Sequence, residues 1–359
     1  MWADRRVLDL LGIELPILQA PMAGANGAAM AIAVSQAGGL GALPCAMLDG
    51  ERIRAEMGTI RQQTAKPVNM NFFCHTPAPP DAARTAAWQA ALAPYYGELG
   101  VDPGAAAPAP ARAPFDDVLC AIVEDVRPAV VSFHFGLPAP DLLGRVKRAG
   151  CTVLASATTV AEARWLEDHG CDAVIAQGAE AGGHRAMFLA TDVTAQPGTF
   201  ALVPQVADAV RVPVIAAGGI ADGRGIAAAL ALGAAAVQVG TAYLFTPEAT
   251  VSALHRRALA DARDDATAMT NLFSGRPARG IVNRLMRELG PMADVAPAFP
   301  TAGAALAPLK AKAEAAGDSG FSSLWAGQAA GLGRMTGAAE LTRQLAADAA
   351  ARLKALAGG

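Results

Sequence analysis

Eight short apolar segments recur along the chain, and they limit what it can fold into. None of them alternates apolar with polar residues, and stretches of helical composition separate them. A strand that is apolar on both faces has to be covered on both sides, as in a parallel sheet between helices. The segments span residues 16–20, 40–44, 67–73, 129–135, 152–157, 173–178, 213–219 and 236–244.

The stretches between these segments carry helix signals. Thr159 and Asp222 each precede a helical stretch and are expected as N-caps. Alternation of strand and helix at this spacing predicts βαβ units with right-handed crossovers. Eight such units predict an α/β protein with a closed (β/α)8 barrel, the TIM barrel.

Two intervals are too long to hold a single helix. Residues 76–114 are rich in Pro and Ala, with a short helix expected around Trp88, and residues 246–320 have mostly helical composition. Both intervals follow the carboxyl ends of strands, where the active sites of such barrels lie. We therefore expect residues 1–75 and 115–245, completed by C-terminal helices within 321–359, to form the barrel. Residues 76–114 and 246–320 are expected to form a helical cap that contributes to a substrate pocket.

Charge and cysteine content exclude several classes of protein. The net charge is -3 and the basic residues are dispersed, so neither a nucleic acid nor an anionic membrane surface is an expected partner. The 5 cysteines include no C-x-x-C pair, and the N-terminus lacks the apolar core of a signal peptide, which favours a cytoplasmic location. Residues 225–245 are uncharged, but Gly233 divides them into a helix and a strand, so no membrane span is expected.

Glycines follow the seventh and eighth apolar segments. Gly218 and Gly219 follow one, and Gly240 with Thr241 follows the other. Glycines at these positions let backbone N–H groups approach a phosphate, and barrels commonly bind phosphate there. Either site alone is explained by a tight turn. Their presence at both strand ends favours a ligand that carries one phosphate.

Polar side chains also occur at other strand ends. Asn69 and Gln177 are amides among apolar neighbours, and buried amides need partners. At one barrel mouth they suit a flat polar heterocycle, either an isoalloxazine ring or a nucleobase. His184 follows two glycines after the sixth segment, and His134 ends the fourth. Glu180 is expected to have a structural role, and Arg185 to anchor the loop or lie in solvent.

Several stretches together resemble the nitronate monooxygenase family, formerly called 2-nitropropane dioxygenases, which are FMN-dependent barrels. The matching stretches are "APMAG" (20–24), "PVNMNFF" (67–73), "VSFHFGLP" (131–138), "QGAEAGGHRAMF" (177–188), "AAGGIADGRGIAAALALGAAAVQVGTAYL" (216–244) and "LWAGQAA" (324–330). "SFHFG" with "EAGGHRA" is most similar to the class I branch. The resemblance implies FMN contacts at Pro21, Met22, Ala23, Asn69, Gln177, Gly182, Gly183, Gly218, Gly219, Gln238, Val239, Gly240 and Thr241.

The resemblance also implies an activity. The family oxidises alkyl nitronates, such as propionate 3-nitronate, with O2 to a carbonyl compound and nitrite, through a flavin semiquinone. Its active-site histidine corresponds to His184, either as a base on the neutral nitroalkane or as an anion-binding group. His134 is a candidate substrate contact. The expected partners are a small nitronate or nitroalkane and O2, and the protein is expected to be a monomer or a homodimer.

Two other functions stay open from the sequence. One is an NAD(P)H-dependent flavin reductase on the same barrel, of the enoyl reductase or NADH:quinone reductase type. The other is a barrel that binds a phosphorylated ligand without turning it over.

Overall fold

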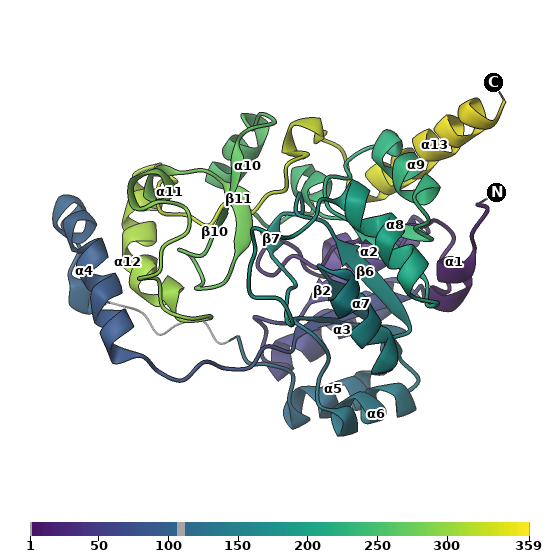
Figure 1. Cartoon of the computed structure of the whole chain (residues 1–359), viewed down its shortest axis with the longest axis horizontal. Helices are drawn as coiled ribbons and strands as arrows, with labels where there is room; N and C mark the ends of the chain where they lie inside the picture. Colours follow the sequence, from purple (N-terminus) through teal and green to yellow (C-terminus); the bar gives the residue numbers. More distant parts are fainter. Residues whose placement is uncertain (1, 106–111, 359) are drawn as a thin grey trace.

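The computed structural model describes residues 2–105 and 112–358. Within this part of the chain, an 8-stranded parallel sheet curls into a barrel, in the order β1-β9-β8-β6-β5-β4-β3-β2 (Figure 1). Each apolar segment of the sequence holds one of its strands, which confirms the predicted TIM barrel. The strands are β1 (Ile17–Gln19), β2 (Gly41–Pro44), β3 (Val68–Phe73), β4 (Val130–His134), β5 (Thr152–Ala157), β6 (Ala173–Gln177), β8 (Val214–Ala217) and β9 (Ala236–Val239).

The barrel closes between its first two strands. Leu18 and Leu40 form a parallel bridge there. The N–H of Gln19 donates to the Leu40 carbonyl at 2.9 Å, and its side-chain Oε1 accepts from the N–H of Ala42 at 2.8 Å. One buried glutamine side chain thus takes the place of a backbone bond at the seam.

A ring of helices surrounds the strands. Its members are α2 (Ala28–Gln36), α3 (Gly50–Gln63), α5 (Asp117–Val126), α6 (Pro140–Arg148), α7 (Val160–Asp168), α8 (Thr199–Ala209), α9 (Gly223–Ala231) and α13 (Ala338–Ala357). Both predicted caps are confirmed. Thr159 Oγ1 accepts from the N–H of Glu162, and Asp222 accepts from the N–H groups of Arg224 and Gly225. The C-terminal helix α13 packs against α9 and α2.

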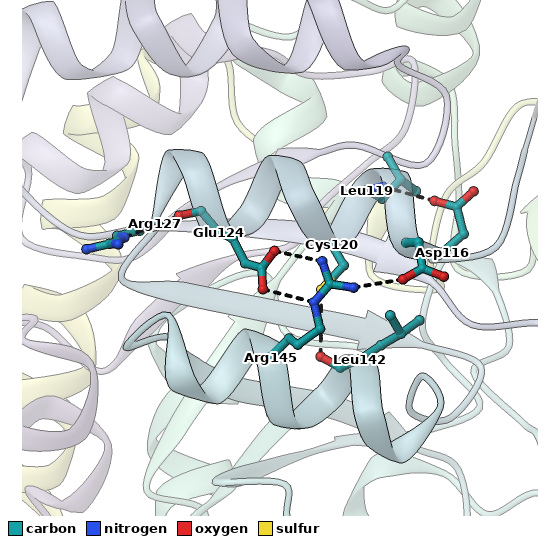
Figure 2. A network of polar contacts seen from close by, with 8 residues as sticks. Asp116, Leu119, Cys120, Glu124, Arg127, Leu142 and Arg145 are labelled. Atoms are coloured by element: carbon teal, nitrogen blue, oxygen red, sulfur yellow. Dashed lines mark hydrogen bonds and ion pairs between the residues drawn. The ribbon is translucent and has the colours of Figure 1, made fainter.

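Charged side chains join neighbouring helices at the outer surface. Arg145 of α6 contacts both oxygens of Glu124 of α5 at 2.9 and 2.7 Å (Figure 2). It also contacts Asp117 of α5 at 2.7 Å. These groups are partly exposed, so solvent weakens the attraction between them. Their bidentate geometry mainly fixes the orientation of α6 against α5.

One end of the barrel is filled with apolar side chains. Helix α1 (Arg6–Leu11) covers the amino ends of the strands, and its Val7, Leu8 and Leu11 pack against inward-facing strand residues such as Val130 and Ile215. In Figure 1 α1 lies near the two termini, on the side away from β7, β10 and β11. Among the described residues, the cavity of the barrel is lined by the carboxyl ends of the strands.

A second group of elements lies beyond those carboxyl ends. Helices α4 (Ala82–Leu99), α11 (Arg284–Leu289) and α12 (Ala302–Ala315) share an apolar cluster, and α4 runs beside α12 (Figure 1). The Trp88 Nε1–H donates to the Ala302 carbonyl at 3.0 Å. The helix around Trp88 has 18 residues and is longer than predicted. Burial of its apolar face against α12, which is distant in sequence, stabilises that length.

Residues 246–320 are less helical than their composition predicts. Besides α11, α12 and the short α10 (Ala253–Ala260), they contain the antiparallel strands β10 (Thr267–Thr270) and β11 (Ala278–Ile281). Strand β11 also pairs with β7 (Gly183–His184). The prediction failed here because these strands are short and because β11 completes its hydrogen bonding with a segment almost a hundred residues earlier.

The long uncharged stretch in residues 225–245 does not form one helix. It is divided among α9, β9 and the 3-10 turn η2 (Thr241–Phe245). Across the described ranges, none of the helices combines the length and the apolar character needed to cross a bilayer.

Candidate active site

A cavity of about 610 Å³ lies at the carboxyl ends of the barrel strands. The inward-facing residues of the strand ends form its floor, because successive strand residues point alternately into and out of a barrel. Loops after the strands form its sides, and α12 with the segment around Trp325 forms its roof. The strand residues are Asn71, Phe73, Ser132, His134, Ser156, Ile175, Gln177, Ala217 and Gln238.

The structure brings together most of the residues predicted from the sequence. The glycine corners after β8 and β9 reach the same cavity as the histidines, although they are far apart in the chain. The predicted residues that line it are Pro21, Met22, Ala23, His134, Gln177, Gly182, Gly183, His184, Gly218, Gly219, Gln238, Gly240 and Thr241.

Two predicted contacts do not line the cavity. Asn69 is the second residue of β3 rather than its end, and its Nδ2 donates to Ser132 Oγ at 2.9 Å one layer below the cavity floor. The prediction that Asn69 ends the strand is wrong, and Asn71, two residues later on the same face, occupies the mouth. Val239 points outward into the core between barrel and helices, because its neighbour Gln238 points inward.

Gln177 holds the loop that carries His184. Its Nε2 donates to the His184 carbonyl at 3.0 Å, and its Oε1 accepts from the N–H of Ala186 at 2.8 Å. The side chain therefore bridges the two ends of the turn after β6 while it also lines the cavity.

Arg185 anchors the same loop from beneath and is fully buried. Its Nη1 and Nη2 donate to the carbonyls of Gly178 and Gln177, both at 2.6 Å. Its Nε donates to Gln196 Oε1 at 2.7 Å. Of the two roles expected for Arg185, loop anchor or solvated residue, the structure confirms the first.

Glu180 has the structural role predicted for it. Its carboxylate accepts from the backbone N–H of Thr199 at 2.8 and 2.9 Å and from the Thr199 hydroxyl at 2.8 Å. Thr199 is the first residue of α8, so the carboxylate lies at the positive end of that helix.

The segment "LWAGQAA" crosses this loop. The N–H of Gly327 donates to Thr241 Oγ1 at 2.9 Å, and the N–H of Gln328 donates to the Glu180 carbonyl at 3.0 Å. A Cβ on Gly182 would lie 2.5 Å from backbone atoms of this segment. Gly182 is therefore required by close approach of two backbones, and the crossing links β6, β9 and the roof of the cavity.

His184 lies in β7, opposite Ala278, and its ring lines the cavity. Its Nε2 lies 2.9 Å from the Ser274 hydroxyl, which in turn donates to the Arg276 carbonyl at 3.3 Å. A hydroxyl that donates its hydrogen to a carbonyl accepts from the ring. This pattern favours the tautomer of His184 with hydrogen on Nε2 and a free lone pair on Nδ1.

Aromatic rings and a second histidine surround His184. Phe299 and Trp325 have ring centroids 5.4 and 5.5 Å from it. The His134 Nε2–H donates to the His184 carbonyl at 3.2 Å, since a carbonyl can only accept. His134 therefore supports the backbone of β7 from the end of β4.

Both rings have strongly lowered pKa values. Burial lowers the pKa of His134 to about 3. Burial first, then the charge of Arg112, places the pKa of His184 well below its ordinary value. His184 is therefore neutral near pH 7, and a neutral imidazole can accept a proton but holds no positive charge for an anion.

Acid is expected to destabilise the protein through these rings. Burial also lowers the pKa of His75 to about 4, below the unfolded value of about 6.5. As pH falls below about 6.5, these histidines bind protons in the unfolded chain but stay neutral in the folded chain. The free energy of unfolding therefore falls by about 1.4 kcal/mol per pH unit for each such ring. In His75→Leu, the free energy of unfolding, measured by denaturant titration between pH 6.5 and 5, should depend less steeply on pH. The slope should decrease by the contribution of one histidine. An unchanged slope would contradict the assignment.

The loops after β8 and β9, which we call the phosphate corner, carry polar groups without hydrogen-bond partners in the described chain. Gly218 and Gly219 have φ of 114° and 68°, a region that favours glycine. Within the described chain, the N–H groups of Gly219, Gly240 and Thr241 donate no hydrogen bond. Gln238 Oε1 is buried in the same cavity and has no partner. A buried amide oxygen is normally satisfied, and the free N–H groups of Gly219, Gly240 and Thr241 are open rather than buried, so these groups fit a phosphorylated ligand with a polar ring edge.

Sequence reasoning missed several lining residues. Asn71 and Ser156 could have been found by counting the alternation inward from each strand end. Arg112 and Phe273 come from the two long intervals, where spacing carries no signal about which residues return to the barrel. Trp325 lies in the stretch "LWAGQAA", for which the sequence predicted no place in the cavity.

Comparison with known proteins agrees with this geometry. The family model described as nitronate monooxygenase matches residues 4–348. The nitronate monooxygenase of Paraburkholderia phytofirmans is 44% identical over 350 residues, covering 95% of this chain and 94% of the relative. The structure of nitroalkane oxidase from Streptomyces ansochromogenes has a TM-score of 0.88 at 40% identity, covering 98% and 99% of the two chains.

FabK from Thermotoga maritima is also similar, with a TM-score of 0.75 at 31% identity and 98% of each chain covered. The family match extends over the barrel, the roof and the helices between them, and most of the predicted residues, though not Asn69 and Val239, line the cavity at the strand ends. The chain therefore belongs to the nitronate monooxygenase family of oxidoreductases.

Proposed function

We propose that this protein binds FMN and uses O2 to oxidise small alkyl nitronates to a carbonyl compound and nitrite. One observation carries the proposal: unsatisfied N–H groups after β8 and β9, the orphaned Gln238 Oε1 and the His184 ring all face a single cavity. The family match and the nitroalkane oxidase neighbour support the same reaction class.

The residues present fit FMN. The backbone of Gly218, Gly219, Gly240 and Thr241 would hold the phosphate. The amides of Asn71, Gln177 and Gln238 would meet the polar edge of the ring, and the loop 20–25 would lie against it. When bound, FMN supplies the electron acceptor for the substrate and passes electrons to O2.

The remaining steps belong to the protein's own side chains. His184, neutral and with a free Nδ1, would take the proton from the carbon next to the nitro group when the substrate is the neutral nitroalkane. The rings of Phe73, Phe299 and Trp325 surround this histidine and exclude bulk water. Residues 76–114 and 246–320 would act as the cap that sets the size of the substrate.

The purified protein is expected to be yellow, with flavin absorption at about 450 nm, and to release nitrite from propionate 3-nitronate in air. In anaerobic stopped flow, the nitronate should bleach the flavin. Rapid bleaching by NADH without any by the nitronate would instead indicate a flavin reductase. A colourless protein that binds phosphorylated ligands without turnover would indicate a non-enzymatic barrel.

Gly240→Asp is expected to weaken FMN binding by at least about 10- to 100-fold, because the new carboxylate repels the phosphate and blocks its approach to the backbone N–H groups. FMN affinity is measured by equilibrium dialysis. Gly58→Asp in α3, where a Cβ meets nothing within 4 Å, is the matched control and should keep FMN bound. Full FMN affinity in Gly240→Asp would refute the phosphate assignment.

A further inference from the structure

Arg112 brings a permanent positive charge to the cavity that contains His184. Its side chain lines the cavity, and its Cζ lies 5.7 Å from the centroid of the Phe299 ring. His184 contacts the same Phe299 ring, with 5.4 Å between centroids. Arg112 and His184 therefore line one cavity and both lie close to the Phe299 ring, and the charge of Arg112 acts on the His184 ring.

The other cations of this region are already engaged. Arg185 donates to three acceptors, and Arg276 donates to the Met187 carbonyl. Lys310 also lines the cavity, but it lies 3.9 Å from the Glu314 carboxylate and its side chain is 46% exposed.

Arg112 differs from all of these. No residue in the described parts of the chain accepts a hydrogen bond from its guanidinium or forms an ion pair with it. Burial lowers its pKa, since no nearby anion compensates the loss of water around the charge. A partly desolvated guanidinium without an acceptor, facing a cavity, is a binding group for an anion.

We propose that Arg112 binds the nitro-group oxygens of the substrate and supplies the positive charge that holds the nitronate beside His184. This inference rests on the proposed function and assigns a role that His184 cannot fill while it is neutral. A nitronate spreads one negative charge over two coplanar oxygens. The guanidinium presents parallel N–H groups in a plane, so the two form a bidentate pair as Arg and carboxylate do.

The two residues then divide the work on the substrate. Arg112 recognises the charge and the planar pair of oxygens, and His184 handles the proton on the adjacent carbon. With a nitronate formed in advance, the loss of Arg112 affects binding of the anion. The site should also bind small planar anions of the same shape, such as nitrate, in competition with the substrate.

Arg112→Gln is the test, with the FMN-loaded enzyme. KM for propionate 3-nitronate should rise about 10- to 100-fold, the range expected for a charged hydrogen-bonded pair, while kcat falls less. The Kd for nitrate, measured by isothermal titration calorimetry, should rise by a similar factor. Arg112→Lys keeps the charge but lacks the planar pair of N–H groups. Its KM for the nitronate and its Kd for nitrate should lie between those of wild type and Arg112→Gln. Lys312→Gln removes an exposed charge from the same roof helix and should change neither constant.

A second readout follows from the field of Arg112. Arg112→Gln removes this charge and should raise the pKa of His184. The pKa is measured from the NMR chemical shift of the His184 ring as pH is varied, in protein with isotope-labelled histidine. If Arg112 has a purely structural role, both Arg112→Gln and Arg112→Lys should change the FMN content and the melting temperature. The two variants should then have the same affinity for nitrate.

The outcomes separate this inference from the proposed function. If wild type binds nitrate through Arg112 but releases no nitrite from nitronates, the proposed reaction fails and the anion site stands. If nitrite release is normal in wild type, and Arg112→Gln leaves both KM for nitronate and Kd for nitrate unchanged, the role of Arg112 is refuted.

Discussion

His184→Asn is expected to lower kcat on neutral nitroalkanes by roughly 10²–10⁴-fold, the usual contribution of a general base. Asparagine has no basic nitrogen to replace the free Nδ1, but it can still accept or donate hydrogen bonds near Ser274. FMN should remain bound, because the phosphate corner lies on other strand ends. The loss on a preformed nitronate should be much smaller, since that substrate needs no proton removed.

The measurement compares nitrite release from nitroethane and from its nitronate, with FMN content determined for each preparation. His169→Asn changes the residue that follows α7, a histidine stacked on Trp165, and is the matched control that should behave as wild type. Equal losses on the two substrates would assign His184 to binding of the anion and would contradict its role as a base.

Arg185→Met is expected to lower the free energy of unfolding by about 3–5 kcal/mol, the range for breaking a buried hydrogen-bonded charge network. The variant leaves the carbonyls of Gln177 and Gly178 and the Gln196 side chain without their buried donor. Those carbonyls end β6, so the loop that carries His184 should also loosen. Denaturant titration gives the stability, and kcat on nitroalkanes gives the effect on the loop.

Arg164→Met is the matched control for this variant, since Arg164 lies exposed on α7 and its loss should cost little. Arg185→Lys keeps the positive charge but cannot reach three acceptors at once, so it should recover only part of the stability. If Arg185→Met and Arg164→Met have the same stability, Arg185 does not anchor the loop.

The barrel was predictable because its signal is local and repeated. A strand covered on both faces must be apolar throughout, and each of the eight runs shows this without reference to any other. The glycine corners were predictable for a related reason. Parallel strands of one barrel end on the same side, so Gly219 and Gly240 had to converge once the fold was known.

The register within a strand was harder to predict. Asn69 and Asn71 both point into the barrel, and only the pairing of β3 with β4 shows which of them lies at the mouth. Their sequence context is nearly the same, since each is an amide between apolar residues. The sequence of one strand does not show how far each inward-facing residue lies from the barrel mouth. That position depends on how the strand is aligned with its neighbours.

The roof depended still more on long-range contacts. Strand β11 pairs with the two-residue β7, and Trp325 and Arg112 return to the cavity from separate intervals. Contacts of this kind join segments that are far apart in the chain, and no periodicity in the sequence encodes them.

The sequence alone determined the fold class, the side of the barrel that carries the site, and the histidine that lies there. These properties follow from patterns within single strands and turns. The tertiary structure decided that burial lowers the pKa of this histidine, that Arg112 lines the same cavity with no hydrogen-bond or ion-pair partner among the described residues, and that Asn71 rather than Asn69 lines the mouth. The pKa of a side chain and its hydrogen-bond partners depend on which residues surround it and shield it from water. Those residues are distant in sequence and come together only in the folded chain.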